Sequence, residues 1–130
     1  MKRILVCDDE PHIVEGLRHL LRGPGRTIEM ASSGVEALSR IEQGMPDLLV
    51  IDIMMPEMSG LEVVAKLRSE EATKHLPIII LTAKGQAQDA TMAQEVWDAF
   101  VMAKPFEPRK LRELVGTTLE SGIWSLQNSI

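Results

Sequence analysis

Apolar residues along the chain gather into five short runs, each followed by a segment in which they recur at helical spacing. The runs are four or five residues long, which is typical of strands. Three are almost continuously apolar, as expected of parallel strands covered on both faces, whereas the second alternates and is predicted to lie at an edge. The predicted strands are Ile4–Cys7, Thr27–Ala31, Leu48–Ile51, Ile78–Leu81 and Ala99–Ala103.

The segments between the runs predict helices with one apolar face. Ser32 or Ser33 is expected to cap the second helix and Ser59 the third, while Gly23-Pro24-Gly25 ends the first. A fourth helix is predicted over about Gln86–Val96, on a weaker apolar stripe. The residues expected on the other apolar faces are Ile13, Val14, Leu17, Leu20 and Leu21, then Val35, Leu38 and Ile41, then Leu61, Val64, Ala65 and Leu67, and finally Leu111, Leu114, Val115 and Leu119.

This strict alternation of strand and helix predicts an α/β fold, (βα) repeated five times, with a parallel sheet between helices on both faces. The length of 130 residues fits one domain. We expect that domain to span residues 1–120 and to be followed by a tail, 121–130.

Composition narrows the classes of function. The formal net charge of −5 argues against direct nucleic-acid binding and against an anionic membrane surface. No apolar stretch approaches the ~18 residues of a membrane span. Cys7 is the only cysteine, so it has no disulfide partner within the chain, and we expect a buried thiol and a cytoplasmic location.

Unusual polar residues fall at the carboxyl ends of the predicted strands. Asp8 and Asp9 follow the first strand, Asp52 the third, Thr82 the fourth and Lys104 the fifth. Parallel strands bring these ends to one edge, where α/β sheets form their sites. Carboxylates gathered there repel one another, and a hard divalent cation such as Mg²⁺ relieves that repulsion. A lysine and a hydroxyl opposite the metal suit the oxygens of a phosphoryl group.

Each of these residues has a simpler reading when taken alone. An acidic residue after a strand is usually a helix cap, and a lone threonine or lysine there is usually a turn or loop residue. All four strand ends carry matching chemistry together, however. We therefore expect a site suited to phosphoryl chemistry on a carboxylate.

Five segments of the chain occur in a recognisable order and spacing. They are Ile4-Leu5-Val6-Cys7-Asp8-Asp9-Glu10-Pro11, Pro46-Asp47-Leu48-Leu49-Val50-Ile51-Asp52-Ile53-Met54-Met55-Pro56, Ser59-Gly60-Leu61, Pro77-Ile78-Ile79-Ile80-Leu81-Thr82-Ala83 and Lys104-Pro105-Phe106. Together they resemble the receiver domain of bacterial two-component response regulators over about residues 2–120. The resemblance implies a flavodoxin-like, doubly wound three-layer sandwich with strand order 2-1-3-4-5.

The resemblance also implies a metal site and a source of phosphate. Asp52 would accept a phosphoryl group from a histidine kinase or a histidine phosphotransfer protein. Asp9 would bind Mg²⁺ directly, Asp8 mostly through water, and Met54 through its backbone carbonyl.

A switch is implied beside that site. Lys104 would pair with Asp52 and then with the phosphoryl group, and Thr82, next to Ala83, would move toward the new oxygens. The bond between Lys104 and Pro105 is expected to be cis.

Two positions depart from the pattern of relatives. Val101 replaces the aromatic residue that commonly stands three positions before the lysine, so an aromatic-coupled readout is in doubt. Trp97 stands where a glycine is common, and is interpreted either as a packing residue or as a contact for a partner. Arg109, at the start of the last helix, is either a solvated residue or a contact for the kinase.

Several functions remain open. The first is a stand-alone receiver, monomeric or weakly dimeric, that signals through a downstream effector protein and is not a turnover enzyme. The second is a receiver cut from a longer regulator with an output domain. A haloacid-dehalogenase-like phosphatase is less favoured, because its nucleophile belongs in Asp-x-Asp after the first strand. A receiver that serves only as an interaction module and is not phosphorylated is disfavoured, because the acid, threonine and lysine set is intact. A flavin-binding protein is disfavoured because Asp8 and Asp9 would repel the phosphate of the flavin.

Overall fold

The computed structural model describes residues 1–82, 99–104 and 107–121. The predicted helix Gln86–Val96, Ala83, Trp97, Pro105 and the tail beyond residue 121 lie outside these residues. The described elements are β1 Lys2–Cys7, α1 Pro11–Leu21, β2 Arg26–Ala31, α2 Gly34–Gln43, β3 Leu48–Asp52, α3 Gly60–Ser69, β4 Ile78–Thr82, β5 Phe100–Ala103 and α5 Pro108–Ser121.

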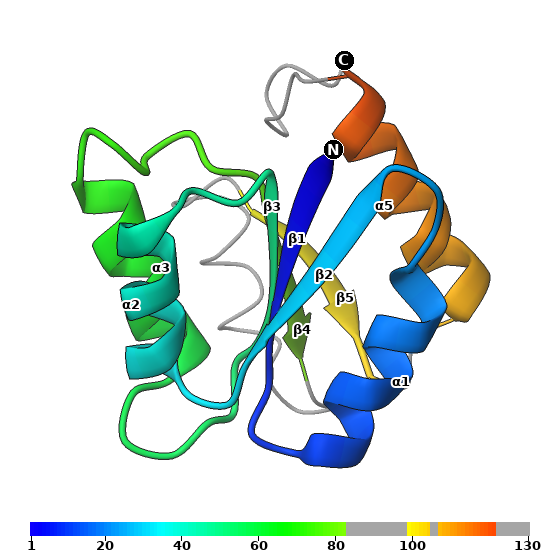
Figure 1. Cartoon of the computed structure of the whole chain (residues 1–130). Helices are drawn as coiled ribbons and strands as arrows, with labels where there is room; N and C mark the ends of the chain where they lie inside the picture. The colour runs from blue at the N-terminus through cyan, green and yellow to red at the C-terminus, as the bar shows by residue number, and fades with distance from the viewer. Residues whose placement is uncertain (83–98, 105–106, 122–130) are drawn as a thin grey trace.

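The strands form one parallel sheet in the order β2-β1-β3-β4-β5, which confirms the expected topology. All carboxyl ends point to the same edge, at the bottom of Figure 1. The chain moves outward from β1 to β2 and then crosses back to β3, so the winding reverses between β1 and β3. In open α/β sheets, such a switch point is where ligands bind.

Helices cover both faces of the sheet: α2 and α3 lie on one side, and α1 and α5 on the other (Figure 1). Successive side chains of a strand point to opposite faces, so each strand contributes to two cores. The core under α2 and α3 contains Leu5, Cys7, Leu49, Ile51, Ile78 and Ile80. The core under α1 and α5 contains Ile4, Val6, Leu48, Val50, Ile79 and Leu81.

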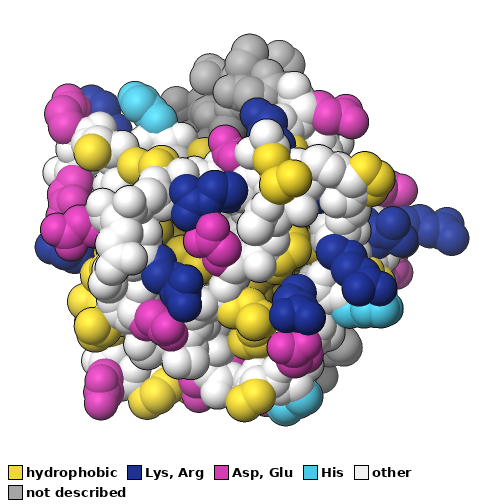
Figure 2. Space-filling model, in the orientation of Figure 1, with side chains coloured by type: hydrophobic (Ala, Val, Ile, Leu, Met, Phe, Trp, Pro, Cys, Tyr) yellow, Lys and Arg dark blue, Asp and Glu magenta, His cyan; other side chains and the backbone are white. Residues whose placement is uncertain are grey.

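Strand β2 forms one edge of the sheet, as its alternating sequence predicts. All of its residues except Ala31 are only partly buried. Arg3 on β1 makes an ion pair with Glu29 on β2, with Nε 2.8 Å from Oε2. Figure 2 looks onto this edge and shows basic and acidic side chains interspersed over it. Charged side chains of this kind protect an edge strand from pairing with another chain.

The predicted serine caps are present. The hydroxyl of Ser33 accepts a hydrogen bond from the Glu36 amide at the start of α2, and Ser59 does the same for Glu62 in α3. The prediction that Val35 lies on the inward face of its helix is wrong, because its side chain is 59% exposed. The buried stripe of α2 is Gly34, Ala37 and Ile41, so Val35 lies on the outward side of the first turn.

Candidate functional site

The carboxyl edge of the sheet brings the predicted polar residues together. Asp8 follows β1, and Lys104 follows β5, as expected. Asp52 and Thr82 are the last residues of β3 and β4, rather than the first residues beyond them. Strands β3 and β4 each extend one residue beyond the predicted end, because the hydrogen-bond ladder of the sheet continues through these polar residues. The Ile53 amide, for example, donates a hydrogen bond to the Leu81 carbonyl at 3.1 Å.

Two carboxylates share one ammonium group at this edge. Nζ of Lys104 lies 3.2 Å from Oδ2 of Asp8 and 3.3 Å from Oδ2 of Asp52. Asp8 is 1% exposed and Asp52 is 3% exposed, so both acids are removed from water. Burying two like charges is costly unless an opposite charge is close, and Lys104 is that charge.

The electrostatics follow from this burial. Loss of water and the nearby charge of Asp8 raise the pKa of Asp52, against the opposing effects of Lys104 and of the Met54 amide. Burial alone would lower the pKa of Lys104, but Asp52 and Asp8 outweigh it and the pKa is raised. Lys104 is therefore held in its charged form between two acids. Of these, Asp52 has a carboxyl group that holds a proton more tightly than an ordinary aspartic acid does.

Asp8, Asp9 and Glu10 can bring carboxylate oxygens within 4.8 Å of one another. Oδ1 of Asp8 also accepts a hydrogen bond from the Glu10 amide at 3.0 Å. Asp9 is exposed, so its carboxylate oxygens are open to a ligand. Clustered hard oxygen donors beside a buried acid fit Mg²⁺.

Backbone packing fixes where Asp52 sits. A Cβ on Gly60, the first residue of α3, would lie 2.2 Å from the backbone oxygen of Asp52. The Gly60 amide also donates to the Ile53 carbonyl at 2.9 Å. Between them, Glu57 has a positive φ of 67°, which is uncommon for a residue other than glycine. The helix therefore begins directly against the backbone of the candidate phosphoacceptor.

The motif Ser59-Gly60-Leu61 contains Gly60, but the sequence pattern predicts no role for this residue. The available signal was its place after the capping Ser59, at the start of a helix. Gly34 is a second such case, because its Cβ would lie 2.8 Å from Val63 Cγ2 and 3.0 Å from the Met58 carbonyl. Both glycines permit close approach of a backbone.

Thr82 and Val101 lie on neighbouring strands at the other side of the site. Thr82 is buried, and its carbonyl accepts a hydrogen bond from the Lys104 amide at 2.6 Å. Val101 is partly buried against the core under α2 and α3, whereas Phe100 packs against the opposite core. Phe100 therefore does not replace the missing aromatic side chain at position 101, as strand alternation predicts.

Arg109 lines a hollow that includes none of Asp8, Asp52, Thr82 and Lys104. It is exposed at the start of α5 and shares this hollow of about 400 Å³, between α1 and α5, with Arg26 and Arg112. Met54 contributes its backbone to the site through the amide that faces Asp52, while its side chain is 61% exposed.

Comparisons with known proteins agree with this arrangement. The family described as response regulator receiver domain matches residues 4–116. The alkaline phosphatase synthesis transcriptional regulatory protein PhoP of Bacillus subtilis is 40% identical over 118 residues, covering 91% of this chain and 48% of PhoP. The DNA-binding response regulator MtrA of Mycolicibacterium smegmatis is 39% identical over 111 residues, covering 85% of this chain and 47% of MtrA.

Solved structures agree as well. A response regulator from Chloroflexus aurantiacus is 36% identical with a TM-score of 0.83, covering 92% of this chain and 98% of its own. A receiver domain from Clostridium thermocellum is 27% identical with a TM-score of 0.82, covering 93% and 96%.

The chain spans about half the length of the curated relatives that it matches. The names of these relatives describe transcriptional and DNA-binding regulators, in partial conflict with the expectation of no nucleic-acid contact. That conflict concerns whole proteins about twice the matched length. Among the described residues, none of the helices combines the length and apolarity that a bilayer crossing requires.

Proposed function

The chain belongs to the family of response regulator receiver domains of two-component systems, and we propose that it accepts a phosphoryl group on Asp52. The donor is a histidine kinase or a histidine phosphotransfer protein. The product changes the affinity of the domain for a downstream effector. The domain catalyses only changes to itself and is not a turnover enzyme.

The observation that carries this proposal is the pairing of Lys104 with both Asp52 and Asp8 at the switch point of the sheet. A buried acid that served only as a helix cap has no need of a lysine from another strand. Asp52 is the last residue of β3, whereas α3 is capped by Ser59. The cap interpretation therefore does not account for Asp52.

In the proposed reaction, an oxygen of the Asp52 carboxylate attacks the phosphorus of a phosphohistidine. The new O–P bond forms as the P–N bond breaks, and the imidazole leaves with the bonding electron pair. The transition state is loose and in-line, with negative charge spread over three oxygens. Lys104 neutralises part of that charge and then pairs with the phosphoryl group.

The proposed cofactor is Mg²⁺, which supplies positive charge to the phosphoryl oxygens when bound. Asp9 and Asp8 would hold it, together with the carboxylate of Asp52 and the carbonyl of Met54. The buried pair of Asp8 and Asp52 supports this role, because two negative charges face the single positive charge of Lys104 and a divalent cation would neutralise the excess.

Thr82 is proposed to stabilise the phosphoryl group and, with Ala83, to move toward it. The product adds about −1.5 to −2 charge at the edge of the sheet, which can bias such a movement. Because Val101 cannot supply an aromatic switch, the change reaches the surface by another route. Trp97 and Arg109 remain proposed partner contacts, and the protein is proposed to be cytoplasmic and monomeric or weakly dimeric.

A second candidate is the receiver segment of a longer DNA-binding regulator. It is favoured by one specific observation: relatives about 40% identical extend to roughly twice the matched length. In that case the effector of the receiver is an output domain of the same protein. The chemistry at Asp52 is the same under both candidates.

The test is phosphorylation with acetyl phosphate and Mg²⁺, followed by intact-mass spectrometry. We expect one phosphoryl group per chain, lost in Asp52→Asn and absent when the metal is chelated. Asp47→Asn, at an exposed residue before β3, is the matched control and should be labelled like the parent. Full labelling of Asp52→Asn would reject the assignment.

A further inference from the structure

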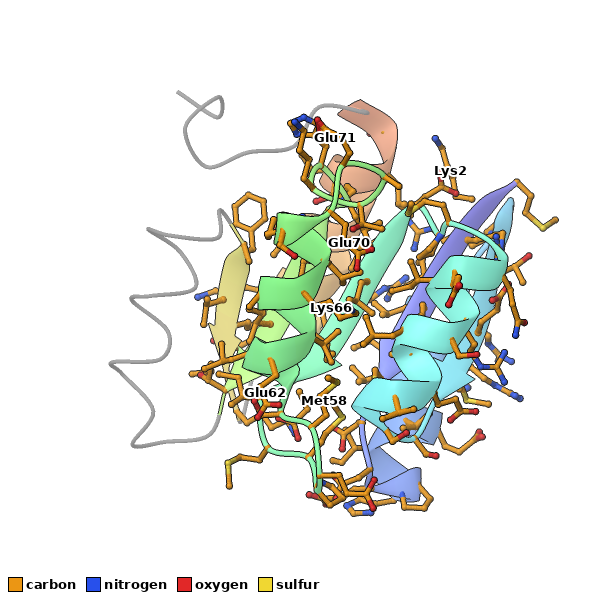
Figure 3. All side chains as sticks on the ribbon, turned by 90° about the vertical axis from the view of Figure 1, so that its left-hand side faces the viewer. Lys2, Met58, Glu62, Lys66, Glu70 and Glu71 are labelled. Atoms are coloured by element: carbon orange, nitrogen blue, oxygen red, sulfur yellow. The ribbon has the colours of Figure 1, made fainter. Side chains whose placement is uncertain are left out.

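A groove runs between α2 and α3, on the face opposite α1 and α5. Its volume is about 530 Å³. The floor is apolar and includes Leu38 and Ile41 from α2 and Leu67 from α3. Figure 3 views this face and shows the two helices side by side.

A second hollow adjoins the groove beyond the ends of the two helices. Met45 and Ala72 line both the groove and this hollow, which has a volume of about 380 Å³ and reaches Leu119 near the end of α5. Met45 is 43% exposed at this junction, and methionine adapts readily to apolar partners. Two neighbouring hollows that share lining residues suit an elongated ligand better than a compact small molecule.

The rim of the groove carries surplus negative charge. Lys66 of α3 and Glu70, the residue just after α3, lie one above the other and line the groove (Figure 3). Nζ of Lys66 is 3.3 Å from Oε1 of Glu70, so these two charges compensate each other. Glu42, on the α2 rim, has no ion-pair partner among residues 1–82, 99–104 and 107–121. An apolar floor beside an uncompensated acid is complementary to an apolar stripe flanked by cations.

We propose that this groove binds an amphipathic helix of a partner protein, with apolar residues facing Leu38, Ile41 and Met45 and a Lys or Arg facing Glu42. Binding of an amphipathic helix in an apolar groove, through side chains spaced about one helical turn apart, is a recurrent form of protein recognition. None of Asp8, Asp52, Thr82 and Lys104 lines the groove, so the groove and the phosphorylation site can be altered by separate substitutions. The failure of helix binding and the failure of phosphotransfer at Asp52 are therefore separate outcomes.

The probe is a synthetic peptide of about 18 residues, roughly five helical turns, with leucine on one face and lysine on the other. Its binding to the full chain is measured by fluorescence anisotropy at moderate salt. We expect Glu42→Lys and Met45→Glu each to weaken binding roughly tenfold, as loss of a central contact often does. Glu113→Lys, the same charge change on exposed α5, should alter affinity less than about twofold, since it is far from the groove.

Three results would overturn the proposal. Equal weakening by Glu42→Lys and Glu113→Lys means general attraction to an acidic protein. Unchanged affinity in Met45→Glu means that the peptide binds elsewhere. The third result is self-association of the parent chain, measured by sedimentation without peptide, that is lost in Met45→Glu. It would mean that a second copy of the chain occupies the groove. Thermal melts of each variant establish that it is folded.

Discussion

The ammonium group of Lys104, just after β5, lies 3.3 Å from the carboxylate of Asp52 at the end of β3, although β4 separates the two strands in the sheet. The same group lies 3.2 Å from Asp8. Three charges from three strands thus form one unit, and changing any one of them alters the environment of the other two.

Asp52→Asn should stabilise the protein near neutral pH. The pKa of Asp52 is raised above its ordinary 3.8, so the folded state binds the proton more tightly than the unfolded chain. The resulting penalty is fully present above the raised pKa and disappears below about 3.8. We expect a gain on the order of 1 kcal/mol at pH 7, with metal chelated, and no gain at pH 3. Thermal melts across pH measure it.

The control for this variant is Asp47→Asn, which weakens the 2.8 Å hydrogen bond from the Arg3 amide and should give no gain. A gain for Asp52→Asn that persists unchanged at pH 3 would contradict the electrostatic cause.

Lys104→Gln should destabilise the protein. The pKa of Lys104 is raised, so its contribution is complete below its ordinary 10.5 and is lost only as the pH rises through the folded value. At pH 7, removal leaves the buried oxygens of Asp8 and Asp52 without their cationic donor, at a cost of about 1–3 kcal/mol. Mg²⁺ should recover part of this loss by supplying positive charge, which chemical denaturation with and without the metal measures.

Lys74→Gln is a matched control, because Lys74 pairs with Glu71 at 2.6 Å on the exposed surface. Its cost should stay below about 0.5 kcal/mol and should not respond to Mg²⁺. Equal costs for the two lysines would mean that Lys104 is only a surface residue.

Asp9→Asn should weaken Mg²⁺ binding about tenfold, since a neutral amide is a poorer ligand than a carboxylate for a hard cation. Isothermal titration calorimetry measures the dissociation constant. Glu42→Gln, at the far end of α2, removes one negative charge away from the site and should leave the constant nearly unchanged. If Asp9→Asn behaves like this control, Asp9 does not bind the metal.

Gly60→Ala should disturb both stability and phosphorylation. The added methyl group would lie 2.2 Å from the Asp52 backbone oxygen, so α3 or the end of β3 must shift. We expect a loss of about 2 kcal/mol or more and slower labelling of Asp52 by acetyl phosphate. Gly16→Ala, inside α1 with open space around its Cβ, should instead stabilise by roughly 0.5–1 kcal/mol. Normal stability in Gly60→Ala would refute the steric argument.

Cys7 should be unreactive in the native protein. Burial, followed by the charges of nearby acids, raises the pKa of its thiol to about 12, and Sγ packs 3.5 Å from Sδ of Met55. Because the thiolate is the nucleophile, we expect slow reaction with a disulfide reagent at pH 8 and rapid reaction after unfolding. Fast labelling of the folded chain would show that the strand end opens.

The sequence alone determined the order of elements and their layers, because the period of apolar residues reports local structure directly. Runs of four or five residues gave all five strands, and serine residues marked the starts of α2 and α3. The same pattern wrongly predicted that Val35 faces the core, since apolar periodicity at the first turn of a helix does not show which side of the helix packs against the sheet. Residues 83–98, including the least regular predicted helix, lie outside the described part of the chain.

For the site, sequence placed Asp8, Asp52, Thr82 and Lys104 at one edge, because parallel strands must end together. Only the tertiary structure decided that one lysine bridges two buried acids, since that depends on strand order and side-chain reach. It also gave Gly60 its role, which arises from the approach of α3 to the backbone of Asp52. Close approach between segments distant in sequence leaves no periodic signal, so it becomes visible only once the chain is folded.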